Sequence, residues 1–109
     1  MIKVNIYKGR DDRIIGFHVS GHARFDRYGR DIVCAAVSVL SLNTINSIEK
    51  FTEDPFKTEQ SDGDLKFKLT GPCSEQTQLL LDSYQLGIDA IAESYGGRYV
   101  KVYIRTKEV

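Results

Sequence analysis

The spacing of apolar residues along this chain changes in an order that few folds can accommodate. Apolar and polar residues alternate in residues 2–7 and again in residues 15–20, with the turn-forming segment 9–12 between them. This pattern predicts a β-hairpin. From residue 31 to residue 51 the apolar side chains are instead spaced by three or four residues, which predicts a helix of about five turns.

A second hairpin and a second helix follow. Residues 65–70 alternate after an Asp62-Gly63 turn and a weaker run at 56–60, as in a hairpin. Helical spacing returns over 74–95 and stops at Gly96, where a left-handed cap is expected, and Val100 opens a last alternating run. The order ββαββαβ predicts an α+β two-layer sandwich, with both helices on one face of a mostly antiparallel sheet.

Length and charge restrict the classes of function. The chain has 109 residues, which suits a single domain over residues 1–109. Lys plus Arg number 15 and Asp plus Glu number 15, so no strong overall field attracts nucleic acid, and direct nucleic-acid binding is not expected. Residues 32–48 carry no charge, but several Ser, Thr and Asn residues interrupt them, so no membrane span is predicted.

The N-terminal residues and the cysteines indicate the compartment. Residues 1–5 alternate like a strand and lack the apolar block of a signal peptide, which predicts a cytoplasmic protein. Cys34 and Cys73 are then expected to be free thiols. Helix 31–51 is unusually free of charge, so its second side needs a cover, which either helix 74–95 or the partner in a homodimer would provide.

The segment between the first hairpin and the first helix is long for a connection. It begins with His22, and Cys34 follows twelve residues later in the first turn of the predicted helix. If Asp31 is the N-cap, the helix dipole and its unpaired amides would stabilise a thiolate at Cys34. A nucleophile and a base could therefore meet here, although a core cysteine and a polar loop histidine explain the same residues structurally.

A metal site is not predicted. The two histidines and two cysteines, His18, His22, Cys34 and Cys73, have no spacing typical of metal ligands. The proposed thiol chemistry also needs no cofactor.

The motif residues resemble a known family. Gly21-His22-Ala23, Gly29 and the run 31–38 are similar to the signature of the bacterial ribosomal-processing cysteine proteases known as Prp. The resemblance implies a cytosolic endopeptidase that removes the N-terminal extension of ribosomal protein twenty-seven of the large subunit. It also implies that Cys34 is the nucleophile and His22 the base, and that the precursor is the partner.

Other residues of the motif and its loop have supporting or binding roles in this interpretation. Gly21, Asp31 and Ser38 are the supporting motif residues; Asp31 either orients His22 or caps the helix, and Ser38 shares a helix face with Cys34. Closure of the loop over a peptide would make Phe25, Tyr28 and Gly29 substrate-binding residues. Phe25 and Tyr28 could equally attach the loop to the core.

Two other functions remain open on the sequence alone. Tyr99, Lys101, Tyr103 and Arg105 alternate near the C-terminus, as in a non-enzymatic, ribosome-associated RNA- or protein-binding module. A Cys/His pair also serves thiol enzymes of other classes, such as acyl transferases.

Overall fold

The chain folds into regular elements in the predicted order. The structure is a computed structural model that describes residues 1–27 and 30–107. Within these residues the elements are β1 (Ile2–Lys8), β2 (Ile14–Ser20), α1 (Ile32–Phe51), β3 (Phe56–Ser61), β4 (Asp64–Leu69), α2 (Glu75–Tyr95) and β5 (Val100–Thr106). The order ββαββαβ is confirmed.

The strands form one sheet in the order β3-β4-β2-β1-β5. The β1–β2, β2–β4 and β3–β4 pairs are antiparallel, whereas β1 and β5 are parallel. A parallel neighbour needs a crossover connection, and α2 provides it by carrying the chain back along the sheet to β5. The prediction of a mostly antiparallel sheet is therefore confirmed.

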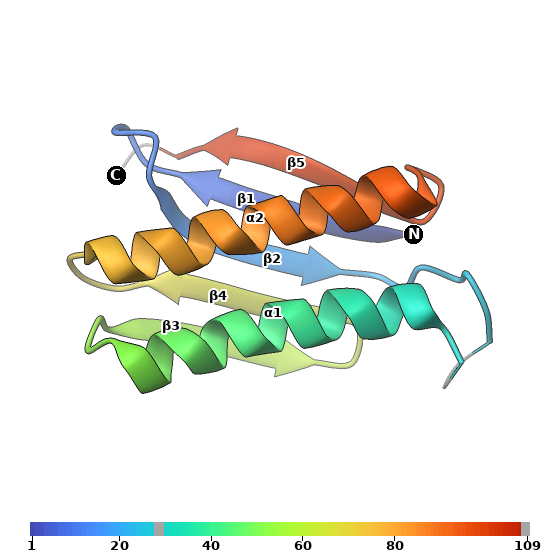
Figure 1. The fold of residues 1–109 in the computed structure, drawn as a ribbon, viewed down its shortest axis with the longest axis horizontal. Helices are drawn as coiled ribbons and strands as arrows, with labels where there is room; N and C mark the ends of the chain where they lie inside the picture. The colour runs from blue at the N-terminus through green and yellow to red at the C-terminus, as the bar shows by residue number, and fades with distance from the viewer. Residues whose placement is uncertain (28–29, 108–109) are drawn as a thin grey trace.

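Both helices lie on the same face of the sheet, side by side (Figure 1). The alternating apolar residues of the strands pack against them, and Phe17 at the centre stacks on Phe67 and on Tyr84 of α2, with ring centroids 5.1 and 4.3 Å apart. The largest completely buried side chains include Tyr84, Phe17, Ile6, Ile14, Ile48, Leu81 and Ile88. The core thus lies between the sheet and the helices, as predicted, and the other face of the sheet is left without a helix.

Each helix begins at a polar cap. The Asp31 carboxylate accepts hydrogen bonds from the Val33 and Cys34 amides at the start of α1, and the Ser74 hydroxyl accepts one from the Thr77 amide at the start of α2. The end of α2 differs from the prediction: Gly96 has a positive φ of 93°, but its ψ of 159° lies outside the left-handed helical region. The Gly96 amide still donates to the Ala92 carbonyl.

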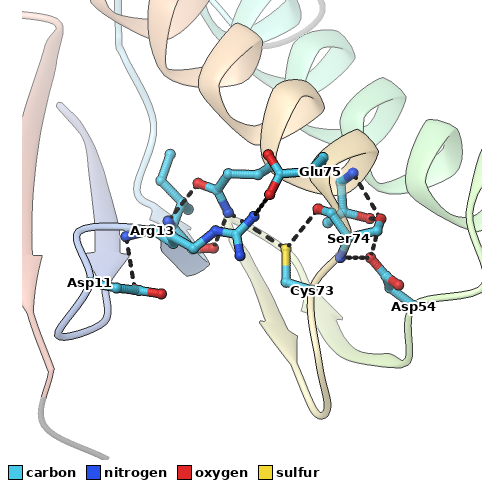
Figure 2. A network of polar contacts seen from close by, with 9 residues as sticks. Asp11, Arg13, Asp54, Cys73, Ser74 and Glu75 are labelled. Atoms are coloured by element: carbon cyan, nitrogen blue, oxygen red, sulfur yellow. Dashed lines mark hydrogen bonds and ion pairs between the residues drawn. The ribbon is translucent and has the colours of Figure 1, made fainter.

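A polar network holds the N-terminus of α2 (Figure 2). Asp54 accepts hydrogen bonds from the amide and hydroxyl of Ser74 at 2.8 and 2.7 Å. The buried side chain of Gln78 bonds both main-chain groups of Ile14 and donates to the Cys73 sulfur at 3.6 Å. Cys73 therefore belongs to a structural network at the end of the sheet opposite to the start of α1 (Figure 1).

The second side of α1 is covered only in part by α2. The two helices approach closely where Leu40 packs on Gly87, because a Cβ at position 87 would lie 2.6 Å from the Leu40 Cδ2 atom. Ile32 and Val39 stay 55% and 67% exposed. Packing by helix 74–95 is thus confirmed for part of the surface, and the homodimer stays a prediction.

By length and composition α1 is apolar enough to cross a membrane, a property that core helices of soluble proteins share. Here the helix buries one side in the protein core, through Val33, Val37, Ser41, Thr44, Ile45 and Ile48. The prediction of no membrane span has no further test in the structure.

Candidate active site

A groove of about 860 Å³ lies where the loop after β2, the first three turns of α1 and the β3–β4 turn meet. The loop and the helix contribute all five of the predicted catalytic and supporting residues to its walls: Gly21, His22, Asp31, Cys34 and Ser38. The β3–β4 turn and the strand ends that flank it, residues 60–65, form the other side. The fold therefore brings the motif residues to one concave surface.

The sulfur of Cys34 lies against the loop main chain. The Ala23 amide donates a hydrogen bond to the Cys34 Sγ atom at 3.2 Å, and Ala23 itself is buried. The Arg24 amide also faces the sulfur, and Arg24 adopts a φ of 57°, which is uncommon for a residue other than glycine. The loop thus turns two consecutive N–H groups toward the thiol.

The pKa of Cys34 differs from the sequence-based expectation. We expected the helix N-terminus to favour the thiolate, but burial raises the pKa of the Cys34 thiol, and the nearby negative charge of Asp31 raises it further. The Ala23 hydrogen bond acts in the opposite direction without reversing the shift. The first-turn amides of Val33 and Cys34 bond Asp31 rather than the sulfur.

Asp31 uses both carboxylate oxygens for main-chain contacts. Its Oδ1 accepts from the Val33 and Cys34 amides at 3.0 and 2.9 Å, and its Oδ2 accepts from the Phe25 amide at 2.9 Å. Partial burial of the carboxyl is outweighed by these N–H donors, which lower the pKa of Asp31. Of the two predicted roles, the structure shows the helix cap, and it adds an attachment for the loop.

His22 packs against the turn between β3 and β4. A Cβ built on Gly63 would lie 2.8 Å from the His22 Nε2 atom, so the imidazole rests on the bare Cα of that glycine. The Gly21 amide donates to the Gly63 carbonyl at 2.9 Å, and the His22 carbonyl accepts from the N-terminal ammonium of Met1. Among the contacts of the described residues, no hydrogen bond joins the imidazole to Cys34.

Gly21 has a conformational reason for its place in the motif. Its φ is +90°, and a Cβ there would collide with the carbonyl oxygen of Met1. Glycine at this position lets the chain leave β2 close to β1 and turn into the loop.

The aromatic loop residues behave differently from the binding role predicted for them. Phe25 is not among the residues that line the groove; its ring packs edge-to-face on Tyr95 and Tyr99, with centroids 5.5 and 5.2 Å away. In this conformation Phe25 attaches the loop to the end of α2, the alternative role. Tyr28 and Gly29 lie outside the described residues, so their substrate-binding role stays a prediction.

The sequence reasoning did not identify the β3–β4 turn as part of the site. Gly63 has a φ of +69°, and the Asp62-Gly63 dipeptide is the signal from which the turn itself was predicted. Nothing in that dipeptide indicates that the turn supports an imidazole from another hairpin. No group of three His, Cys, Asp or Glu side chains suited to a metal was found in the described part of the chain.

Comparison with known proteins decides the family. The model of the cysteine protease Prp family matches residues 1–101. The chain belongs to the Prp family of cysteine proteases. Among its Prp relatives, the ribosomal processing cysteine protease Prp of Bacillus subtilis is 26% identical over 101 residues, which cover 87% of this chain and 90% of the relative.

Solved structures share the fold of this Prp-family protein. The Streptococcus mutans protein SMU.848 is 32% identical, with a TM-score of 0.81 over 98% of this chain and 96% of that one. The ribosomal processing protease Prp of S. aureus, solved with a covalently linked product peptide, is 24% identical, with a TM-score of 0.91 over 96% of this chain and 100% of that one. The family and the enzyme class inferred from the motif are thereby confirmed.

The raised pKa of Cys34 predicts how its alkylation depends on pH. In the free protein, the rate of iodoacetamide modification of Cys34 should rise at a higher pH than in the denatured chain, because burial disfavours the thiolate. Asp31→Asn should move the curve to lower pH, since it removes a negative charge near the sulfur. Peptide mapping separates Cys34 from Cys73. A native curve at lower pH than the denatured one would instead indicate a thiolate paired with an imidazolium.

Proposed function

We propose that this protein is a cytoplasmic endopeptidase that removes the N-terminal extension from the precursor of large-subunit ribosomal protein twenty-seven. The proposal rests on one observation above all: a member of the Prp family carries Cys34 and His22 on the walls of the same groove. The names of its relatives as ribosomal processing proteases support the substrate. The groove volume of about 860 Å³ suits a peptide segment rather than a single side chain.

In the proposed mechanism His22 is the base and Cys34 the nucleophile. The imidazole takes the thiol proton, and the sulfur attacks the carbonyl carbon of the scissile peptide bond. When the C–N bond breaks, the imidazolium gives its proton to the leaving amine, and a thioester remains on Cys34. Water, deprotonated by His22, hydrolyses the thioester and releases the new carboxylate and the free thiol. Substrate binding has to bring the sulfur and the imidazole within hydrogen-bonding distance of each other while the ring stays over Gly63.

The oxyanion of this reaction would be bound by the loop rather than by the helix. Among the first-turn amides of α1, those of Val33 and Cys34 already bond Asp31. The Ala23 and Arg24 amides face the sulfur. Donors held there in advance would stabilise charge that develops on a carbonyl oxygen next to Sγ.

The substrate is tested by incubating the purified protein with the full-length precursor and measuring the products by mass spectrometry. The expected result is one cut that yields the extension peptide and the mature protein. A precursor that stays intact, or that is cut at many sites inside its folded part, would contradict the proposal. A precursor truncated to its mature N-terminus is the control and should not be cleaved.

We also propose that two copies associate through the exposed side of α1. A shallow apolar groove there is lined by Ile32, Ala35, Ala36, Val39, Leu40, Asn43, Gly87 and Ile91. Light scattering should give twice the chain mass, and Val39→Glu should give single chains because a buried carboxylate disfavours the contact. Leu79→Glu, at a position that is 70% exposed on α2 and outside this groove, is the matched control. A monomeric wild type contradicts the proposal.

A further inference from the structure

The face of the sheet that carries no helix has a composition of its own. Residues paired directly across neighbouring strands share a face, so the register extends this face from Lys66 on β4 through His18 and Asn5 to Tyr103 on β5. A row here is a set of residues paired across the strands. The next row on each side of this one, on the same face of the sheet, is also polar. The cationic residues that these rows bring together are Lys3, Lys57, Lys66, Lys68, Lys101 and Arg105.

The same rows contain only two carboxylates, Glu59 and Asp64. Both have partners on the face, because Glu59 pairs with Lys66 at 3.8 Å and Asp64 with His18 at 2.6 Å. The face therefore has a formal net charge of +4 with histidine neutral. In contrast, α2 on the other side of the sheet has four acidic residues and no basic ones over Glu75–Tyr95. The chain as a whole is neutral, but the helix-free face of the sheet is positively charged and α2 is negatively charged.

Two tyrosines stand among these cations. Tyr7 and Tyr103 are half-buried on the adjacent strands β1 and β5. The Lys107 ammonium lies 4.2 Å from the centre of the Tyr7 ring, and the Arg105 guanidinium lies 5.1 Å from that of Tyr103. Each cation thus lies over its ring, so a base that stacks there takes the place of the cation, which can then contact a phosphate. Tyr99, predicted for the same surface, precedes β5 and packs on Phe25 instead.

We propose that this helix-free face binds single-stranded RNA. Its positive charge complements the phosphate backbone, and its two tyrosines offer stacking positions. Asn5 Oδ1 accepts from Arg105 Nε at 2.9 Å and His18 Nε2 bonds Asp64 at 2.6 Å, which leaves the Asn5 amide nitrogen and the His18 Nδ1 atom for bases and 2′-hydroxyls. A protein segment rich in carboxylates would match the charge but has no bases to stack on the tyrosine rings. The inference revises the expectation of no direct nucleic-acid binding, which used the net charge of the whole chain. It does not depend on the proposed proteolysis.

Fluorescence anisotropy with a labelled 12-nucleotide oligouridine and the full-length protein tests the proposal. At low salt we expect a Kd in the range of about 1–100 µM, rising steeply with KCl, as for phosphate contacts without sequence specificity. Lys68→Glu and Tyr103→Ala should each weaken binding at least about fivefold, whereas Tyr103→Phe keeps the stacking ring and should bind like wild type. Circular dichroism verifies that each variant is folded.

The controls separate this face from the rest of the molecule. Lys50→Glu makes the same charge change on α1, in the helix layer, and should leave the Kd within about twofold. Cys34→Ala should also bind RNA like wild type, because Cys34 lies on α1 and not among the residues of this face. No anisotropy change, an equal loss in Lys50→Glu, tighter binding of oligodeoxyuridine, or equal binding of labelled polyglutamate would each overturn the proposal. The last result would indicate an acidic protein partner.

Discussion

Replacing Cys34 with alanine is expected to lower kcat/KM for precursor cleavage by at least about 10³-fold, since no other group near the groove can form the thioester. The fold should persist, because Cys34 is only half-buried at the edge of the core, and the variant loses one hydrogen bond, from Ala23, and a small part of this packing. Cleavage is followed by mass spectrometry and unfolding by circular dichroism.

Cys73→Ala is the matched control for this variant. Cys73 is the other free cysteine and is also half-buried, but it lies in the polar network of α2, where it contacts Ser74 and Gln78. Its loss should lower stability slightly and leave kcat/KM within about twofold of wild type. Cleavage that survives in Cys34→Ala and disappears in Cys73→Ala would reject the assignment of the nucleophile.

His22→Ala should lose activity to a similar extent, because the two groups act as a unit and their effects are not additive. Such a loss in both variants, with cleavage retained in Cys73→Ala, is the pattern that a Cys/His mechanism requires.

The fold could be predicted from the sequence because its determinants are local and periodic. The alternation of residues 2–7 and 15–20 and the helical spacing of residues 31–51 each arise from one face that must be buried. Asp31 and Ser74 mark the helix starts through side chains that bond amides two or three residues away. Such signals need no knowledge of the tertiary structure.

The candidate site was predictable only as far as its motif extends. His22 and Cys34 could be chosen from a short segment, but the contact of His22 with Gly63 joins two separate hairpins. The packing of Phe25 on Tyr95 likewise depends on where α2 ends. The pKa of Cys34 depends on which groups the Asp31 oxygens bond, and spacing along the chain does not determine that.

The charge distribution is a further property that composition conceals. Equal numbers of acidic and basic residues suggested a surface without a field, yet the register collects cations on one face of the sheet while α2 collects carboxylates. Only the pairing of the strands shows which of the lysines are neighbours.

Gly63→Ala should lower kcat/KM about 100-fold although position 63 contributes no functional group. The added Cβ would lie 2.8 Å from the His22 Nε2 atom, closer than van der Waals contact allows, so the imidazole must rotate away. The ring is the flexible end of its side chain and can move without unfolding the loop. A displacement of about 1 Å is enough to cost about two orders of magnitude when a base has to meet a nucleophile. The loss should fall on kcat.

Gly96→Ala is the control that isolates this steric effect. Gly96 also has a positive φ, +93°, but a Cβ there would meet no atom within 4 Å. Both variants should lose unfolding free energy, about 1 kcal/mol or more, and the loss should be larger in Gly96→Ala because the φ and ψ of Gly96 lie in a region that is essentially restricted to glycine. Only Gly63→Ala should lose activity. Equal kcat/KM values in the two variants would show that the imidazole acts from a position other than the one over Gly63, and that the turn between β3 and β4 plays no part in placing the base.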